Sequence, residues 1–598
     1  MIELVKKCVH PLSSFFAQHP RLTIGFVALS VRIIVAYIFY GSCDIDAFTE
    51  IIGCIVLDGP ISYGIKNWNM LPSISFYLWF AGFLAAKTPL LLALCIKLIP
   101  IFCDAALALL LYEIVFVQRS AQAFGVGLLY ALCPVCVVIN AIHGQWESVF
   151  LLPLLLSFYV REYGAPSYTT SVIFGALFGL SVLIKPVSLL FLPFFFTPCP
   201  GVAHALGRWW HYLKIMGIVG VGIASGIGAF LGCTKYRLME GYPFILHYRL
   251  TLSVLAFCVL MVLVGMIKKI ITLSPQFKRY AVLQLAAMAS FMVVMGGAFL
   301  AFTLLKFNLL GLLDTCLRYA NKGPQGFGLR LVVSSIWPLL GSIMENRLVL
   351  LLWVAASAWA YYRQKIDVFD AMVVVFAGIF GFSGLCPHYL IWLVPCALLV
   401  GMYCSIGLYG FLTTLLYAMY YNPPQQCDWA FLYRLSFAPL SSYSWLAPHE
   451  WLKTNDIVVP LMALVGNWLI PLSCWLMVWQ IAIKNRHERS TSCDAKKHNG
   501  IPGRWFITLI IGVSGMILLL MCVTDHQTLA VTFNQKALAR YAPYAIVCNG
   551  AYVLRSMDIM RAAALPYCNA VTLLLLWGVL WSLGIVWFGF TQRHKVLT

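Results

Sequence analysis

The sequence predicts an all-α polytopic membrane protein with about 12–16 transmembrane helices. Of its 598 residues, 62% are hydrophobic and only 10% are charged, and the mean hydropathy is +0.88. Soluble globular proteins carry roughly 25% charged residues, so a soluble enzyme or a series of soluble domains is excluded. Intrinsic disorder is excluded as well, because it requires a polar composition that this chain lacks.

The predicted spans are apolar runs of about 20 residues, the length that crosses a hydrocarbon layer of about 30 Å. The clear runs are residues 22–41, 89–117, 122–141, 147–161, 168–184, 215–233, 249–267, 281–304, 348–362, 369–386, 389–406, 456–483, 505–523 and 566–590. Two shorter runs, 186–198 and 407–421, bring the total to about sixteen. Residues 73–86 are apolar but short and follow Pro72, so we predict a helix that lies in the membrane interface.

Lysine and arginine near the span ends predict the side on which each turn lies, because cytoplasmic loops retain these residues. With the N-terminus inside, alternation places the short basic turns inside too, at Arg21, Arg119, Arg161, Arg208, Lys214, Lys268, Lys269, Lys278, Arg279, Arg363 and Lys365. The polar loop 484–504 and the basic tail fall on the same side, so both termini are expected in the cytoplasm. The long loops, rich in Trp, Tyr and Pro, then lie outside: 42–88, 234–248, 305–347, 422–455 and 524–565.

The net charge and the cysteines both have explanations that suit a membrane protein. The 40 Lys and Arg residues against 21 Asp and Glu give a charge of +19, which cytoplasmic loops account for. No arginine-rich stripe with interleaved aromatic residues is present, so no nucleic-acid partner is expected. Most of the 20 cysteines lie singly in apolar runs, which is typical of packing residues. Cys133 and Cys136 have a CxxC spacing without a second pair or a histidine cluster, so no zinc site is expected.

Two carboxylates, Asp44 and Asp46, follow directly after the first predicted span. On an extended backbone, residues i and i+2 point the same way, so both side chains would serve one site. One would act as a general base, and the other as its partner or as a metal ligand. The alternative is that both are solvated carboxylates at a helix end.

Further ionisable residues fall at the same predicted outer ends of the spans. They are His143 and Glu147 in one turn, Lys185 after the next span, and His388 with Tyr389 at the start of a later span. Cations there suit an anionic ligand such as a phosphate, with candidates Lys185, His388, His143, Arg237, Arg249, Arg318 and Arg330. The alternative for each is a side chain that snorkels to the interface. Arg32, Lys97 and Asp104 lie within predicted spans, and a structural polar network is expected for them.

The first outer loop resembles that of the GT-C glycosyltransferases, polytopic enzymes that use polyprenyl- or dolichyl-phosphate sugars. It begins with residues 44–50 (DIDAFTE) and continues through a G-x-x-Y step, a Trp/Asn segment and Pro72 to the apolar run 73–86. Within the superfamily, this stretch is most similar to dolichyl-phosphate-mannose-dependent mannosyltransferases. Residues 140–148 (NAIHGQWES) resemble an N-x-I-H-G-Q-x-D turn, with Glu147 where Asp is usual. Residues 183–186 (LIKP) and 387–395 (PHYLIWLVP) resemble two further family motifs, and the resemblance covers residues 20–400.

The resemblance implies a GT-C-like fold with interfacial helices on the outer side. It divides the chain into a catalytic membrane core over residues 1–420 and a C-terminal membrane module over 421–598 with two long outer loops. It implies an inverting transfer of a sugar, mannose by similarity, from a lipid-phosphate donor to a glycan, lipid or protein acceptor on the outer or lumenal face. Asp44 and Asp46 are the expected catalytic residues, and a divalent metal, Mg or Mn, is permitted on them but not required. The expected donor-phosphate and substrate residues are His143, Gln145, Glu147, Lys185, Arg318, Tyr319, His388 and Tyr389.

Two other functions fit the same sequence. A transporter or flippase for a lipid-linked anionic substrate would explain the outer cations without catalysis, and it would line its pathway with charged residues inside the membrane. An O-antigen polymerase or ligase would centre on a large outer loop with Arg and His, and would not need Asp44 or Asp46. The His-containing turn and the compact cytoplasmic loops favour a bacterial inner membrane over the endoplasmic reticulum.

Overall fold

The computed structural model describes residues 18–38, 43–58, 73–88, 90–196, 275–304, 347–382, 386–420, 464–487, 545–548, 551–554 and 575–592, with single positions 333, 337 and 461. Its elements in chain order are α2 (Pro20–Ile38), α3 (Cys43–Asp58), α4 (Ser73–Lys87), α5 (Leu92–Ala131), α6 (Pro134–Val137), η2 (Val138–Ile142), α7 (Glu147–Tyr163), α8 (Tyr168–Ile184), η3 (Pro186–Phe191), α9 (Leu192–Phe196), α13 (Pro275–Leu304), α17 (Arg347–Tyr362), α18 (Val368–Phe382), η5 (Pro387–Trp392), α19 (Leu393–Val400), α20 (Tyr403–Tyr420), η8 (Val465–Leu469), α23 (Ile470–His487), β1 (Ala545–Cys548) and β2 (Ala551–Leu554). A final helix, Leu575–Gln592, follows.

The described residues are predominantly helical, as expected for an all-α fold, and one short antiparallel pair, β1 and β2, accompanies the helices. The pair aligns Cys548 with Ala551 and lies within the predicted outer loop 524–565. Five described helices are long and apolar enough to cross a membrane, and six shorter apolar helices accompany them. The described chain is therefore compatible with an all-α polytopic membrane protein. The predicted spans 215–233, 249–267 and 505–523 lie outside the described residues.

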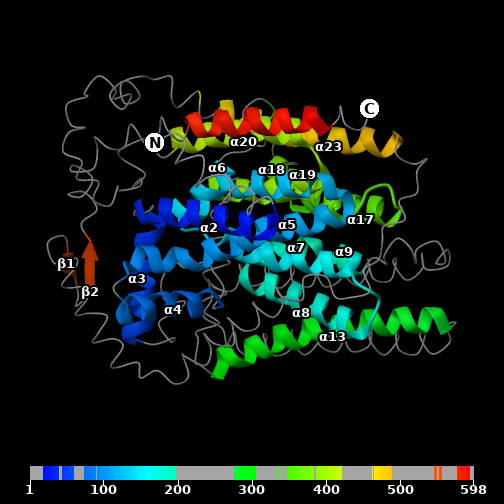
Figure 1. Cartoon of the computed structure of the whole chain (residues 1–598). Coiled ribbons are helices and arrows are strands. Elements are labelled where there is room, and N and C mark those ends of the chain that lie inside the picture. The colour runs from blue at the N-terminus through cyan, green and yellow to red at the C-terminus, as the bar shows by residue number, and fades with distance from the viewer. Residues whose placement is uncertain are drawn as a thin grey trace.

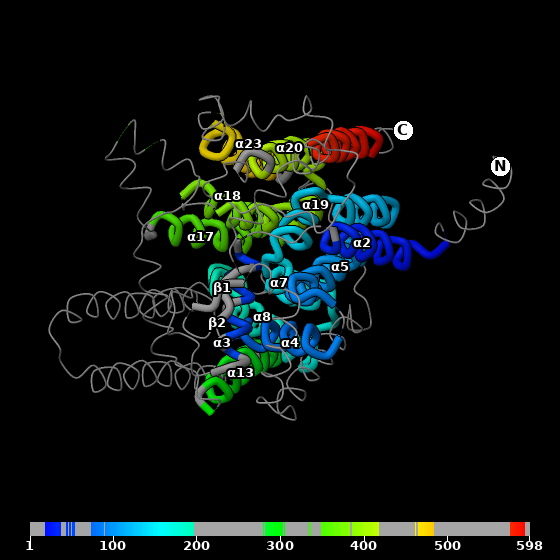
Figure 2. Tube along the Cα trace, turned by 90° about the vertical axis from the view of Figure 1, so that its left-hand side faces the viewer, coloured from blue at the N-terminus to red at the C-terminus, as the bar shows by residue number. Residues whose placement is uncertain are grey.

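The helices stack as layers with α5 and α7 in the interior (Figures 1 and 2). The helices α20, α23 and Leu575–Gln592 form one outer layer, and α8 with α13 forms the opposite one. The last helix is fixed to the core by Trp581, whose indole N–H donates to the Leu129 carbonyl at 2.8 Å. The predicted module 421–598 thus contributes helices that pack directly on the N-terminal core, while its boundary at residue 420 stays a prediction.

The segment labelled α5 is two antiparallel helices that meet at Arg119, whose backbone is non-helical (φ −149°, ψ 68°). Asp104 and Tyr130 would lie about 39 Å apart along one straight helix, at 1.5 Å per residue. Their side chains are instead hydrogen-bonded at 2.5 Å, and Gly127 packs against Tyr112 and the Ala108 carbonyl. The chain therefore folds back on itself, as the two predicted spans 89–117 and 122–141 require.

Several of the turns predicted to share the cytoplasmic side are brought to one end of this bundle. Arg21 pairs with Glu113 at 2.6 Å, and Arg119 donates to the Leu399 carbonyl at 2.5 Å. Neighbouring contacts at the same end join Gln118 to Tyr163 and Tyr361 to Glu162. The other ends of α7, α8 and α19 carry the ionisable residues predicted for the outer side, so the bundle has two chemically different ends.

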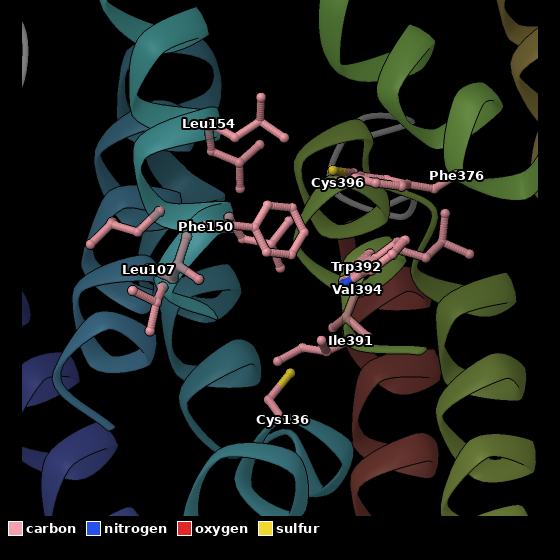
Figure 3. Close-up of a cluster of buried hydrophobic side chains, with 14 of the residues drawn as sticks. Leu107, Cys136, Phe150, Leu154, Phe376, Ile391, Trp392, Val394 and Cys396 are labelled. Carbon is pink, nitrogen blue, oxygen red and sulfur yellow. The ribbon is translucent and has the colours of Figure 1, made fainter. Parts of the chain in front are cut away.

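Buried hydrophobic side chains fill the space between α7, α18 and η5 (Figure 3). Trp392 is 2% exposed and contacts the ring of Phe150 edge-on at 5.5 Å and that of Phe376 at 5.6 Å. Its indole is amphipathic, so the ring anchors η5 in the core while the N–H group remains available for a polar partner. This packing fixes the start of η5, where His388 and Tyr389 lie.

Candidate active site

The turn between η2 and α7 carries three of the predicted site residues. The π-helical η2 ends at His143, whose N–H donates to the Val138 carbonyl at 2.8 Å, and the Gln145 N–H donates to the Ile139 carbonyl at 3.0 Å. Gly144 has a φ of +70°, a conformation that side chains rarely adopt, and a Cβ there would collide with Ile45. The sequence His-Gly-Gln therefore forms a compact turn pressed against the start of α3.

Asp44 lies beside this turn. Its Oδ2 atom accepts a hydrogen bond from the Gln145 amide at 2.5 Å and lies 3.1 Å from His143 Nδ1. The side chain of Asp44 is 37% exposed whereas that of His143 is 6% exposed, so the carboxylate remains accessible from outside the protein. An aspartate held in this way can accept a proton from a hydroxyl group that approaches it.

The expectation that Asp44 and Asp46 lie on an extended backbone is wrong, because both belong to helix α3. Residues two apart on a helix do not face each other, so helix geometry does not support one site for both carboxylates. The side chain of Asp46 lies outside the described residues, as do Arg318, Tyr319 and the other loop arginines at 237, 249 and 330. Their predicted roles are not tested by the structure.

A second cluster surrounds Glu147, the first residue of α7. The side chain of Glu147 is 1% exposed and forms an ion pair with Lys185, which lies between α8 and η3. Its other oxygen accepts the Trp392 indole N–H at 2.5 Å, and His388 Nε2 lies 3.7 Å from Oε1. The carboxylate of Glu147 is thus surrounded by three groups that can donate a proton or a hydrogen bond: Lys185, Trp392 and His388.

Aromatic rings cover the Lys185 ammonium group. Its Nζ lies 4.4 Å from the centre of the Tyr389 ring and 4.9 Å from that of Trp392, within the range of cation–π interactions. The His388 and Tyr389 rings meet edge-on with centroids 4.4 Å apart. The side chain of Lys185 is 26% exposed, so part of its length faces away from the protein core.

The two clusters adjoin at a pair of histidines. The rings of His143 and His388 have centroids 5.9 Å apart, so Asp44 on one side and Glu147 with Lys185 on the other belong to one continuous group. The group draws on α3, the turn before α7, the residue after α8, and η5. The structure therefore brings together Asp44, His143, Gln145, Glu147, Lys185, His388 and Tyr389 from the predicted site.

Burial sets the protonation of the groups that lie between the helices. It lowers the pKa of His143, an effect that the nearby Asp44 carboxylate opposes only in part. Burial also lowers the pKa of Lys185, and the pairing with Glu147 works against that change. His143 is therefore a neutral imidazole near pH 7, able to accept or donate a proton without carrying permanent charge.

The predicted metal site on Asp44 and Asp46 includes a side chain outside the described residues, so it stays a prediction. Among the described residues, no group of three or more His, Cys, Asp or Glu side chains is placed to hold a metal ion.

Two residues near the site were not predicted to belong to it. Trp392 lies in the motif 387–395. A buried indole N–H group usually has a hydrogen-bond partner, and that requirement could have pointed to a carboxylate such as Glu147. Lys97 is fully buried and packs against Gly144 of the turn. The sequence predicts a structural role for Lys97, and its complete burial is compatible with that role.

Asp44, the 143–147 turn, Lys185 and His388 come from four separate segments of the chain and meet at one end of the bundle. A comparison of the chain with protein-family models, with curated proteins and with solved structures finds no match.

Proposed function

We propose that this chain is a membrane glycosyltransferase that moves a sugar, mannose by resemblance, from a polyprenyl- or dolichyl-phosphate donor to an acceptor hydroxyl on the outer or lumenal face. The observation that carries the proposal is the meeting of an accessible carboxylate, Asp44, with the Lys185 ammonium group and the His388 imidazole at one end of the bundle. Sugar transfer from a lipid phosphate needs both, a base for the acceptor and positive charge for the departing phosphate.

In the proposed reaction Asp44 accepts the proton of the acceptor hydroxyl. The acceptor oxygen forms a bond to the anomeric carbon as the bond from that carbon to the phosphate oxygen breaks, and the configuration inverts. The lipid phosphate leaves with the bonding electrons. Lys185 stabilises its charge as a cation, and His388, whose pKa burial lowers well below its ordinary value, does so as a neutral hydrogen-bond donor. Gln145 and His143 orient Asp44. Glu147 keeps Lys185 in place and does not bind the phosphate, because a carboxylate repels it.

The buried ion pair Arg32–Asp104 gives no support to the alternative of transport through the described core. Both side chains are 0% exposed and Arg32 Nε lies 2.5 Å from Asp104 Oδ2, so this charge is sealed inside protein and lines no pathway. A transporter requires charged groups within the membrane that face an accessible path.

The test is transfer of label from synthetic polyprenyl-phosphate-[³H]mannose by the purified protein in liposomes, with extracted membrane lipids as acceptors. We expect label in a new product and a rate at least about 100-fold lower for Asp44→Asn, the usual scale for loss of a general base. Asp46→Asn is measured separately. Asp367→Asn, an exposed position before α18 at the other bundle end, is the matched control and should keep the wild-type rate.

Each failure has a distinct meaning. No new labelled product with the wild-type protein overturns the transferase proposal, and movement of intact donor across the liposome membrane then supports a flippase. If both aspartate variants transferred sugar at the wild-type rate, the transferase proposal would stand, but the assignment of Asp44 as the general base would be wrong.

A further inference from the structure

A line of polar groups on the first half of α5 lies beneath the 143–147 turn. Lys97, Pro100 and Asp104 are spaced i, i+3 and i+7 and therefore share one face of the helix. Lys97 packs against Gly144, the Pro100 carbonyl faces Ser148, and Asp104 lies one turn further along. This face therefore contacts Gly144 within the turn and Ser148 directly after it.

Asn140 and Ser148 connect that face to the two ends of the turn. The Ser148 hydroxyl lies 2.9 Å from the Pro100 carbonyl oxygen and 2.9 Å from the Asn140 amide oxygen, and shares its hydrogen between them. The Asn140 amide group donates to the Cys136 carbonyl at 2.9 Å. Since Asn140 precedes the turn and Ser148 follows it, their contact closes the loop that holds His143 and Gln145.

The far side of this connection is anchored rigidly. Arg32 donates to Asp104 Oδ2 at 2.5 Å and to the Ala131 carbonyl at 2.7 Å, and Tyr130 donates to Asp104 Oδ1 at 2.5 Å. Arg32, Asp104, Asn140 and Ser148 are all 0% exposed. A buried network in which the groups are held by several bonds has little freedom, so it can fix the position of the turn that it contacts.

We propose that Ser148 and Asn140 are positioning residues, which hold the 143–147 turn on the polar face of α5 so that Gln145 and His143 keep Asp44 in its reactive place. This inference rests on the proposed function. Neither residue lies on Asp44 itself; they act through the turn. A displacement of about 1 Å at a reacting group can lower a rate by roughly 100-fold, so a weakened brace should lower kcat far more than it changes KM.

The test compares Ser148→Ala with two other serine variants of the same helix. Ser148→Thr keeps the hydroxyl and should restore function. Ser157→Ala is the matched control, because Ser157 is also fully buried in α7 but donates only within its own helix, to Leu154. We expect Ser148→Ala to lower kcat at least tenfold with KM within twofold, and the other two variants to stay close to wild type.

Hydrogen exchange measured by mass spectrometry on the peptide that contains residues 138–149 gives a readout independent of sugar transfer. In the same detergent, Ser148→Ala should exchange the Gln145 amide hydrogen at least tenfold faster, since its bond to the Ile139 carbonyl would open more often. Faster exchange with an unchanged kcat would show that Ser148 holds the turn but does not position the site. Unchanged exchange would show that Ser148 does not hold the turn. Either result overturns the inference. Absence of any transfer by the wild-type protein would instead overturn the proposed function, and exchange would still decide whether the turn is braced.

Discussion

Trp392 donates its indole N–H to the buried carboxylate of Glu147 across a separation of 245 residues in the chain. The bond joins η5 to the first residue of α7, and the second oxygen of Glu147 binds Lys185 after α8. One carboxylate therefore holds together three segments that each contribute a residue to the candidate site. Loss of the contacts of Glu147 should therefore lower both the stability of the protein and the activity of the site.

Replacing Glu147 by Ala should destabilise the protein by about 3 kcal/mol, because it leaves Lys185 and the Trp392 indole without their buried partner. The measurement is the free energy of unfolding in mixed micelles with increasing SDS. Glu113→Ala is the control, since its ion pair with the 61%-exposed Arg21 lies at the surface and should contribute about 0–1 kcal/mol. Equal losses in the two variants would contradict the structural role of Glu147.

The Arg32–Asp104 pair should behave as a buried ion pair whose halves depend on each other. Arg32→Met leaves an uncompensated carboxylate in the interior and should cost about 3–5 kcal/mol. The double variant Arg32→Met/Asp104→Leu removes both charges and should recover at least half of that loss in the same unfolding assay. Additive losses in the double-mutant cycle would show that the two side chains are not coupled.

Stability should fall on acidification partly through His143. Because burial lowers its pKa in the folded protein, the unfolded chain binds more protons between that lowered pKa and about 6.5. Unfolding is therefore favoured as the pH drops through this window, by at most about 1.4 kcal/mol per pH unit for one group. Unfolding free energies between pH 7.5 and 5.5 should show a smaller decrease for His143→Gln than for wild type. An identical decrease in both proteins would mean that His143 does not contribute.

Helices α8 and α13 should tolerate no side chain at Gly175. A Cβ there would overlap the backbone carbonyl of Ala287, so Gly175→Ala should destabilise the protein by about 1–3 kcal/mol. A Cβ at Gly297 in α13 would meet no neighbouring atom. Gly297→Ala should therefore raise the free energy of unfolding by up to about 1 kcal/mol through helix propensity. Thermal unfolding in detergent distinguishes the two, and a stable Gly175→Ala variant would contradict the close contact of these helices.

Hydrophobic patterning predicted much of the helical framework. The predicted run 168–184 coincides with α8, and the pair of runs around Arg119 is seen as the antiparallel halves of α5. The pattern fails where prolines start short 3₁₀ segments, as at Pro186 and Pro387, because these break a continuous apolar run into two elements. The strands β1 and β2 were missed although Asn549-Gly550 between them is a strong signal for a two-residue hairpin turn.

The residue types of the site were predictable, but their geometry was not. Ile45, Phe48, Ile52 and Ile55 are buried at helical spacing, and this pattern in the sequence argues for α3 against the extended backbone that was expected. The pairing of Glu147 with Trp392 depends on how distant helices pack, which local patterns do not encode. The alternation of basic and non-basic turns identified residues that share one end of the bundle, because successive spans must end on opposite sides of a membrane.

Cryo-electron microscopy of the purified protein with added polyprenyl phosphate tests the central claim most directly. The account predicts phosphate density within hydrogen-bonding distance of the Lys185 ammonium group, on the side of the cluster that faces Asp44. Phosphate density bound at the opposite end of the bundle, beside Arg21 and Arg119, or no density at saturating lipid, would contradict it.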